Sequence, residues 1–365
     1  MKYYLLVGEK SGDMHASNLM KEIKENDAEA EFRYLGGEGM VRQGGELYAD
    51  YADVSYMGFW EVFKNVFTLK KKIKACAKDV LNWQPDIVVF IDFSGFNMRI
   101  APLIDGKGIK LYYYIAPKVW AWNTKRVYKM VRYLDRVYCI LPFEEFFFHS
   151  YGLPTYYMGN PIVDEILAYK PNERFLIGNK ISDKPIIAIL PGSRKQEIEN
   201  ILSKAIEVVE QFPDFQFVIA GVSHLPESLY AKALGGKDIK VVYNQTYDLL
   251  GHSTAAIVTS GTATLETALF NIPQVVVYKT SFITASIVKM VIKIDYVALV
   301  NLVADKMIVR ELLQEKFTVD NIVMELQSII INGEDRSVML EEYAKLQANM
   351  GDAGVSGRVA KHMIK

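Results

Sequence analysis

The sequence predicts an α/β protein made of two doubly wound, parallel-sheet (Rossmann-like) domains that face a cleft. Three observations support this fold class. The chain has 365 residues, which is long for one hydrophobic core and comfortable for two. Short apolar runs rich in β-branched and aromatic residues alternate with longer amphipathic stretches, and the same alternation occurs in both halves. Near-continuous apolar strands between helices are typical of parallel sheets that are covered on both faces.

The expected strands define the two halves. They span 3–7, 87–92, 110–115, 137–141 and 155–158 in the first half, and 186–190, 215–220, 241–243, 255–259 and 275–278 in the second. We expect a first domain over 1–168 and a second over 175–340, joined through the charged stretch 169–184, which is typical of a linker. A C-terminal helix over about 341–365 is expected either to pack back on the first domain or to meet a partner.

Composition narrows the function classes. The net charge is −1, so global electrostatics give no case for binding nucleic acid. The two cysteines and five histidines lack metal-ligand spacing, so neither a metal nor a cofactor is expected. The N-terminus does not resemble a signal peptide, and no window approaches the ~20 uncharged residues of a membrane span. We expect a cytoplasmic protein that is at most attached to a membrane surface.

Polar and glycine-rich clusters follow the ends of the expected strands in both halves. Ligands of open parallel sheets bind at the carboxyl ends of the strands. Two such domains that each hold one substrate would have the geometry of a transferase.

The clearest phosphate-binding pattern is Gly192, Ser193 and Arg194, which follow a strand and precede a helix. Glycine lets the backbone approach a phosphate, a helix start offers free N–H groups, and arginine is a two-pronged donor. The alternative is an ordinary helix cap.

A second helix start of this kind has Glu266 about one turn into the helix, where a carboxylate can accept hydrogen bonds from ribose hydroxyls. The alternative is a capping box between Thr262 and Glu266. Together the two loops predict a site for a nucleoside diphosphate. The residues of this second loop are Ser260, Gly261, Thr262, Ala263 and Thr264.

The first half instead offers carboxylates at strand ends. Glu9 and Asp13 flank the turn that contains Ser11 and Gly12, where the alternative is helix capping by Ser11 or Asp13. Asp92 stands at the end of another strand, where it could act as a general base or merely brace its loop.

The stretch 58–78 is amphipathic on a helical wheel, with bulky apolar side chains over about half of the circumference. Lys70 and Lys74 lie within that apolar arc and would have to reach out of it. Aromatic side chains with lysines are typical of a helix at an anionic membrane surface; the alternative is a surface helix packed on the sheet. The expected lipid contacts are Phe59, Trp60, Phe63, Val66 and Phe67.

Read in order, nine segments resemble the lipid-A-disaccharide synthase family over nearly the whole chain. They are Gly-Glu-Lys-Ser-Gly-Asp (8–13), Tyr-Met-Gly-Phe-Trp-Glu-Val (56–62), Ile-Asp-Phe-Ser-Gly-Phe-Asn (91–97), Tyr-Ile-Ala-Pro-Lys-Val-Trp-Ala-Trp (114–122), Leu-Pro-Phe-Glu (141–144), Met-Gly-Asn-Pro (158–161), Leu-Pro-Gly-Ser-Arg (190–194), Ser-Gly-Thr-Ala-Thr-Leu-Glu (260–266) and Glu-Leu-Leu-Gln (311–314).

The resemblance implies a GT-B fold and an inverting, metal-independent glycosyl transfer. The donor would be UDP-2,3-diacylglucosamine. The acceptor would be 2,3-diacylglucosamine 1-phosphate, whose 6-hydroxyl attacks the anomeric carbon to give a β-1,6 disaccharide and UDP. Acylated substrates imply the cytoplasmic face of the inner membrane, and a homodimer is conceivable. The resemblance adds Asn301, Glu311 and Gln314 on the donor side, and Asn97 and Trp122 join Ser11 and Gly12 on the acceptor side.

The sequence also departs from the family pattern. Many members have a second aspartate, the favoured base, where this chain has Gly95. Asp92 is therefore the expected base, with Glu9 and Asp13 as rivals. Asn160 replaces a common histidine and Arg310 a common proline. The alternative functions are another GT-B enzyme that uses UDP-N-acetylglucosamine, such as a cell-wall transferase or a 2-epimerase, and a non-catalytic homologue that binds nucleotide sugar or lipid.

Overall fold

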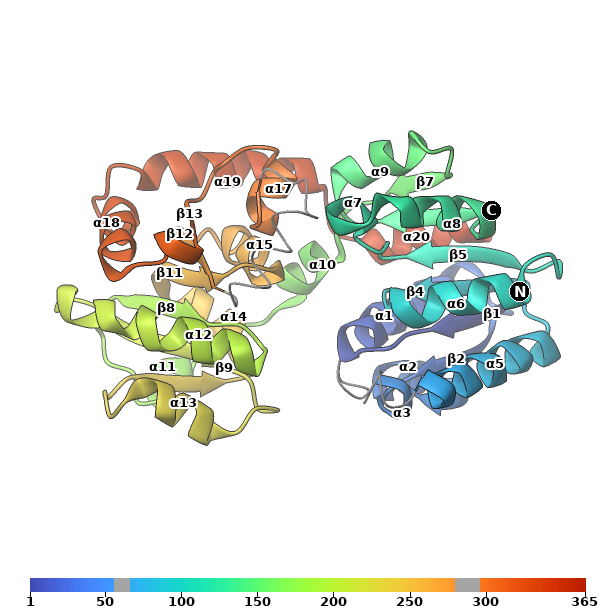
Figure 1. Ribbon diagram of the computed structural model, residues 1–365, viewed down its shortest axis with the longest axis horizontal. Helices are drawn as coiled ribbons and strands as arrows, with labels where there is room; N and C mark the ends of the chain where they lie inside the picture. Colours follow the sequence, from blue (N-terminus) through green and yellow to red (C-terminus); the bar gives the residue numbers. More distant parts are fainter. Residues whose placement is uncertain (56–65, 280–295) are drawn as a thin grey trace. The chain divides into compact units, whose positions relative to one another are not determined.

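A computed structural model describes residues 1–55, 66–279 and 296–365. The chain divides into two compact units, which Figure 1 shows in colours that follow the sequence. Unit 1 comprises Met1–Asp164 together with Asp352–Lys365, and unit 2 comprises Glu165–Gly351. Helix α10 (Pro161–Ala168) spans the first boundary. Each unit is described by itself.

Unit 1 is built on a seven-stranded sheet in the order β3-β2-β1-β4-β5-β6-β7, and every neighbouring pair is parallel. Its strands are β1 (Lys2–Leu6), β2 (Glu31–Gly36), β3 (Glu46–Asp50), β4 (Ile87–Ile91), β5 (Lys110–Tyr114), β6 (Arg136–Cys139) and β7 (Thr155–Tyr157). Its helices are α1 (Lys10–Asn26), α2 (Glu38–Gln43), α3 (Ala52–Ser55), α5 (Val66–Trp83), α6 (Ser94–Ile104), α7 (Val119–Trp122), η1 (Thr124–Arg126), α8 (Val127–Tyr133), α9 (Pro142–His149) and α20 (Val355–Ile364).

Helices cover both faces of this sheet because its central strands are apolar on both sides. Along β4, Val88 and Phe90 belong to the core under α5, α6 and α8, while Ile87, Val89 and Ile91 belong to the core under α1 and α20. Figure 1 shows α5, α6 and α8 in front of the strands. The C-terminal helix α20 thus completes a hydrophobic core of unit 1 and not the core of unit 2.

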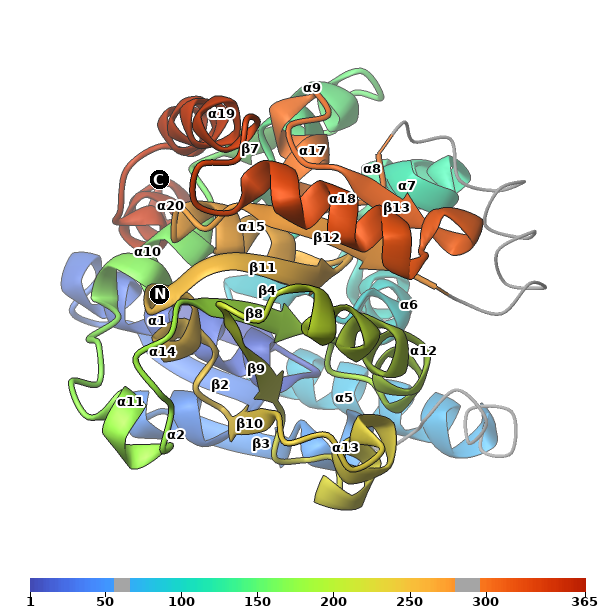
Figure 2. The ribbon, with the colours of Figure 1, turned by 90° about the vertical axis from the view of Figure 1, so that its left-hand side faces the viewer.

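Unit 2 repeats the design with six parallel strands in the order β10-β9-β8-β11-β12-β13. Its strands are β8 (Ile186–Leu190), β9 (Gln216–Gly221), β10 (Lys240–Tyr243), β11 (Ser253–Thr259), β12 (Gln274–Tyr278) and β13 (Glu311–Leu313). Its helices are α11 (Phe175–Gly178), α12 (Lys195–Ala205), η2 (Ile206–Gln211), α13 (Glu227–Leu234), α14 (Thr246–Gly251), α15 (Thr262–Leu269), α17 (Leu299–Ala304), η3 (Gln314–Lys316), α18 (Val319–Ile329) and α19 (Arg336–Met350). Figure 2 shows α12, α13 and α18 on one side of its sheet.

Three strands were not expected from the sequence, for physical reasons. β2 carries Glu31 and Arg33 among its apolar residues, so it lacks a continuous apolar run. β3 and β13 are edge strands, and edge strands tolerate exposed side chains and short length.

The predicted boundaries also shift. The expected linker 169–184 lies within unit 2 and contains α11, whose Phe175 is buried in the second core. The expected C-terminal helix is two helices, which separate at Gly351. Of these, α19 belongs to unit 2, and only α20 packs back on unit 1, against α1.

Both sheets reverse their strand order at one point, between β1 and β4 in unit 1 and between β8 and β11 in unit 2. Connections leave in opposite directions at such a point, which opens a crevice at the carboxyl ends of the two strands. The loops that follow these four strands are 7–9, 92–93, 191–194 and 260–261. They contain or adjoin most of the site residues predicted from the sequence.

Candidate active site

The loop after β4 holds Asp92 in an uncommon conformation. Asp92 and Phe93 both have left-handed backbone angles, with φ of 46° and 43°. Such a conformation costs about 1–2 kcal/mol for a residue with a side chain, so its surroundings must impose it. The hydroxyl of Tyr113 donates to the carbonyl oxygen of Asp92, and the amide of Asn97 donates to the same oxygen over 3.0 Å. The loop is therefore fixed from the neighbouring strand β5 and from helix α6.

The carboxyl group of Asp92 is partly buried, and burial raises its pKa. The backbone N–H of Phe93 and the positive charge of Lys118 act in the opposite direction, because both favour the ionised form. A partly desolvated carboxylate at a strand end is suited to accept a proton from a hydroxyl group.

Asn97, predicted to contact the acceptor, is fully buried. Its Nδ2 atom also lies 3.4 Å from the carbonyl oxygens of Leu6, at the end of β1, and Ile91, at the end of β4. Asn97 therefore joins the two strands at the reversal point and positions Asp92, and its side chain has no exposed surface for the predicted contact with the acceptor.

The loop after β1 packs against the loop after β4. A Cβ atom on Gly8 would lie 2.0 Å from the ring of Phe93, so only glycine lets the two loops meet here. Glu9 and Ser11 are exposed at the start of α1, whereas Gly12 is buried against Val7. Glu9 and Ser11 therefore stay candidates for contact with a substrate.

Asp13 holds backbone groups in place, which argues against its predicted catalytic role. It is buried, and its carboxylate oxygens accept backbone hydrogen bonds from Gly37 (2.7 Å), Gly39 (2.8 Å) and Met40 (3.3 Å). The alternative of a cap from Ser11 or Asp13 is not seen, because the N-cap residue of α1 is Glu9 and no side chain caps this helix. Asp13 holds the start of α2 against α1.

Glu144 is a buried carboxyl group that sequence reasoning did not assign to the site. Burial raises its pKa to about 7, although it accepts hydrogen bonds from the indole N–H of Trp120 (2.9 Å) and the backbone N–H of Leu141 (3.1 Å). This pair ties α7 to α9. Trp122 lies at the end of α7, and its side chain is outside the described part of the structure.

In unit 2, the loop after β8 is organised by Glu197. This carboxylate accepts from the backbone N–H groups of Ser193 (3.0 Å) and Arg194 (3.2 Å) and forms an ion pair of 2.9 Å with the Arg194 guanidinium. Gly192 has φ of 103°, and a Cβ there would lie 2.2 Å from Glu197. Glu197 therefore caps this helix, as the alternative stated, and it occupies the backbone N–H groups of Ser193 and Arg194. The Arg194 side chain is nevertheless 82% exposed, so its guanidinium can meet a phosphate.

The loop after β11 presents an open helix start. Gly261 and Thr262 are exposed and Ala263 is partly exposed, at the point where the first amides of α15 have no acceptor within the helix. The hydroxyl of Ser260 donates to the carbonyl of Val297 over 2.9 Å. Thr264 is fully buried, and its hydroxyl donates to the carbonyl of Gly261 over 2.8 Å. The backbone of this loop can therefore contact a diphosphate, but the side chain of Thr264 cannot.

Glu266 does not form the capping box that was the alternative to ligand binding. Instead it is partly buried and accepts a hydrogen bond of 3.2 Å from the hydroxyl of Tyr247. Burial raises its pKa, and the Tyr247 hydrogen bond opposes this effect. The carboxylate keeps further lone pairs with which it can accept from a ribose.

Asn301, predicted to bind the donor, is fully buried and has no exposed side-chain surface for a direct contact. Its amide nitrogen donates to Val309 and Glu311, and its amide oxygen accepts from Ile308 and Val309. Glu311 in turn accepts from the backbone N–H groups of Val297 and Ala298, directly before α17. This network supports the loop at Ser260. Gln314 is partly exposed, with φ of 50°.

The predicted lipid-binding segment is described only in part. Phe59, Trp60 and Phe63 lie outside the described residues, and Val66 begins α5. Phe67 is 87% exposed, and Lys70 and Lys74 are exposed as well. Further along α5, Ile73 and Val80 are buried in the core of unit 1. The described part of the segment is therefore a helix packed on the sheet, as the alternative stated. Across the described residues no helix is both long and apolar enough to cross a membrane, and no cluster of acidic, histidine or cysteine side chains is suited to a metal.

Two Rossmann-like, parallel-sheet domains define the GT-B class of glycosyltransferases and related epimerases, and known structures agree. A putative UDP-N-acetylglucosamine 2-epimerase from Listeria monocytogenes has a TM-score of 0.70 at 12% identity and covers 99% of this chain and 95% of its own. The UDP-N-acetylglucosamine 2-epimerase from Neisseria meningitidis, solved with UDP-N-acetylglucosamine bound, has a TM-score of 0.64 at 13% identity and covers 100% of both chains. At such identities these likenesses show the fold alone.

Sequence similarity identifies the family. The lipid-A-disaccharide synthetase family matches residues 3–355. A lipid-A-disaccharide synthase from Myxococcus xanthus is 32% identical over 368 residues, covering 99% of this chain and 96% of the relative. One from Hydrogenovibrio crunogenus is 34% identical and covers 93% of each. The chain belongs to the lipid-A-disaccharide synthase family.

Proposed function

We propose that this protein transfers 2,3-diacylglucosamine from UDP-2,3-diacylglucosamine to the 6-hydroxyl of 2,3-diacylglucosamine 1-phosphate, forming the β-1,6 disaccharide 1-phosphate and UDP. The observation that carries the proposal is the family match over residues 3–355. The two reversal points support it, because one carries the Asp92 carboxylate on a loop whose backbone is held in place, and the other has an open helix start with an exposed arginine.

In the proposed reaction the acceptor's O6 forms a bond to the anomeric carbon while the bond from that carbon to the diphosphate breaks. Asp92 takes the proton from O6, and Glu9 is the remaining rival for this role. The electron pair of the broken bond leaves on UDP, where the N–H groups of α15 and the Arg194 guanidinium stabilise the added charge. Direct displacement of this kind inverts the anomeric configuration and requires no metal ion.

On the donor side, the proposed contacts are the backbone of Gly261, Thr262 and Ala263 to the diphosphate and Glu266 to the ribose. Ser193, after β8, and Gln314, after β13, are the further proposed donor contacts. On the acceptor side, Ser11 stands beside Glu9 at the start of α1. Other predicted residues support the donor site indirectly, by holding its loops in place: Gly192, Ser260, Thr264, Asn301 and Glu311. Gly12 and Asn97 support the acceptor side in the same way.

The decisive experiment measures UDP release and product mass with both acylated substrates. Formation of a β-linked disaccharide 1-phosphate at an undiminished rate in EDTA is the expected result. Interconversion of UDP-N-acetylglucosamine and its 2-epimer without a transfer product would favour the epimerase function instead. Binding of UDP-sugar with no UDP release in the presence of acceptor would indicate a non-catalytic homologue.

We also propose that the protein works at the cytoplasmic face of the inner membrane, with the exposed Phe67 and the lysines of α5 in contact with lipid. Phe67→Ser should reduce co-sedimentation with vesicles that contain anionic phospholipid. Phe146 is the matched control, since it is 81% exposed on a different helix, α9. Equal loss in Phe146→Ser, or no loss in Phe67→Ser, would contradict this orientation. A homodimer stays a prediction, which analytical ultracentrifugation can test.

A further inference from the structure

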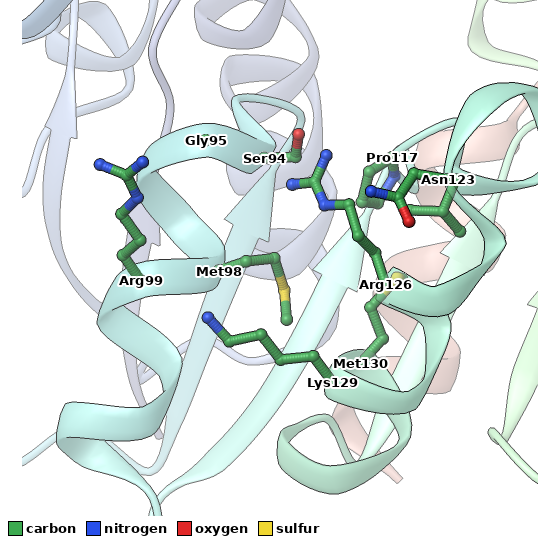
Figure 3. A pocket seen from close by; sticks show the side chains of 10 residues that line it. Ser94, Gly95, Met98, Arg99, Pro117, Asn123, Arg126, Lys129 and Met130 are labelled. Carbon is green, nitrogen blue, oxygen red and sulfur yellow. The ribbon is translucent and has the colours of Figure 1, made fainter. Parts of the chain in front are cut away.

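Unit 1 contains a cavity of about 640 Å³ between the first turns of α6 and the segment that runs from Pro117 into α8. Figure 3 shows the residues that line it. Its position is informative, because Ser94 lines the cavity and lies only two residues after Asp92. Two residues span at most about 7 Å of chain, so the cavity adjoins the loop that carries the proposed base. Its volume is in the range of cavities that hold small ligands.

Three cationic side chains line this cavity: Arg99 from α6, Arg126 from η1 and Lys129 from α8. Among the described residues that line it there is no aspartate or glutamate. Within the described ranges, neither Arg99 nor Lys129 forms an ion pair. Burial lowers the pKa of Lys129, and the nearby positive charges of Arg99 and Arg126 lower it further. Mutual repulsion of this kind is relieved when an anion binds among the cations.

The remaining lining residues fit a polar ligand with a charged end. In Figure 3 the guanidinium of Arg126 extends toward Ser94, beside the amide of Asn123, and Lys129 extends toward α6. The hydroxyl and the amide add neutral hydrogen-bonding groups next to the guanidinium, whose planar fork matches phosphate oxygens. Met98 and Met130 are buried and provide an apolar wall.

We propose that this cavity binds the anomeric phosphate of the acceptor sugar, with Arg126 and Lys129 as direct phosphate ligands and Arg99 at the rim. The inference rests on the proposed function, which supplies an acceptor with a 1-phosphate, and adds to it the site that recognises that group. A phosphate held beside the Asp92 loop would fix the acceptor sugar at one end and leave its 6-hydroxyl at the other end free to meet the base.

The test compares Lys129→Met and Arg126→Gln with the wild-type protein, using acceptors that carry or lack the 1-phosphate. Lys129→Met keeps most of the side-chain length and removes the charge. Lys125→Gln is the matched control, since Lys125 is exposed, close in sequence and outside the cavity lining. Circular dichroism and thermal unfolding establish that each variant is folded.

The expected result is a KM for the phosphorylated acceptor that rises roughly 10- to 100-fold in each cavity variant, the size of a lost charge-assisted hydrogen bond. The donor KM and kcat stay within about twofold, and Lys125→Gln resembles wild type. With the acceptor that lacks phosphate, wild type and variants should have the same KM. An equal rise in KM for both acceptors would overturn the proposal. So would a rise that occurs with anionic phospholipid vesicles but vanishes in neutral detergent, because it would assign the cations to the membrane.

A direct titration separates this proposal from the proposed function. Glucosamine 1-phosphate should bind to wild type, as followed by NMR, and bind at least tenfold more weakly to Lys129→Met, while glucosamine should not distinguish them. If wild type makes no disaccharide but shows this difference, the phosphate site stands and the function fails. If wild type makes disaccharide and Lys129→Met changes neither KM nor the titration, the function stands and the phosphate site is overturned.

Discussion

The side-chain amide of Asn97 donates a hydrogen bond of 3.0 Å to the backbone carbonyl of Asp92. Asp92 is thereby held in a left-handed conformation at the end of β4, and the same amide lies near the end of β1. A buried residue from the first turns of α6 thus sets the direction in which the proposed base points.

Asn97→Ala should lower kcat at least tenfold, because Asp92 loses one of the two groups that hold its carbonyl. UDP binding, which we propose for unit 2, should stay within about twofold. The buried amide also makes a structural contribution, so the free energy of unfolding should fall by about 1–3 kcal/mol. Urea denaturation measures that loss of stability, and steady-state kinetics on the folded protein measure the fall in kcat. An unchanged kcat in folded Asn97→Ala would show that Asp92 does not depend on it.

Lys118→Met should move the acidic limb of the pH–rate profile to higher pH. Lys118 favours the ionised form of Asp92, so its removal raises the pKa of this carboxyl beyond the rise that burial already causes. A base must be deprotonated to act, so the rate at low pH falls while the rate on the plateau is unchanged. Lys118 is exposed, so the shift should be small and should shrink in high salt. A shift to lower pH would exclude Asp92 as the titrating base.

Arg194→Ala should lose most of the transferase activity and weaken UDP binding roughly 10- to 100-fold. The free energy of unfolding should change by less than about 1 kcal/mol, because an exposed ion pair contributes little. Lys195→Ala is the control, since this neighbouring cation is also exposed, at 68%, and pairs with Glu199 instead. Isothermal titration with UDP compares the variants. If both bind UDP as wild type does, the phosphate role of Arg194 is wrong.

Glu266→Gln should weaken UDP binding, whereas binding of 2′,3′-dideoxy-UDP should hardly change, because the lost contact is the one to the ribose hydroxyls. For wild type, burial raises the pKa of Glu266, so UDP affinity should fall as the pH is lowered through that pKa and the carboxylate takes up a proton. The variant should lack this dependence. Tyr247→Phe, which removes only the hydrogen bond to Glu266, serves as a comparison with the carboxylate intact. Equal weakening for both nucleotides would place Glu266 away from the ribose.

Asp13→Asn should destabilise the protein by about 2–4 kcal/mol, since the amide keeps only one acceptor oxygen and its NH2 group would oppose the N–H of either Gly37 or Gly39. Asp13→Ala, which removes the carboxylate without adding donors, should also destabilise. The specific activity of the folded fraction should stay within about tenfold of wild type. A variant with wild-type stability and no activity would restore Asp13 as a catalytic residue.

Much of the fold could be predicted because its signals are local. The central strands, such as β4 and β8, are apolar on both faces and therefore stand out in the sequence. Strands β2 and β13 were not predicted, because their polar residues Glu31, Arg33 and Glu311 acquire their surroundings only when the chain is folded. Arg33, for example, pairs with Asp79 of α5 over 2.8 Å. The break at Gly351 between α19 and α20 likewise depends on which core each helix completes.

Residue type and spacing were enough to propose the two loops as phosphate sites, and the exposure of Arg194 is compatible with that proposal. The capping role of Glu197 could also have been predicted, since Glu197 stands three residues after Arg194, the N-cap residue of α12. No spacing shows that Tyr247 meets Glu266 or that Tyr113 holds Asp92, because these partners come from other elements of the chain.

The sequence by itself determined the alternation of strands and helices, the loops at the reversal points and the family, because these depend on residue type and order along the chain. Only the tertiary structure decided which polar side chains are free to act. Asp13, Asn97 and Asn301 are of residue types common in sites, yet each is buried and forms hydrogen bonds with backbone groups, and Asn301 also with the side chain of Glu311. Folding must satisfy buried polar groups first, and which groups are buried depends on contacts between distant parts of the chain.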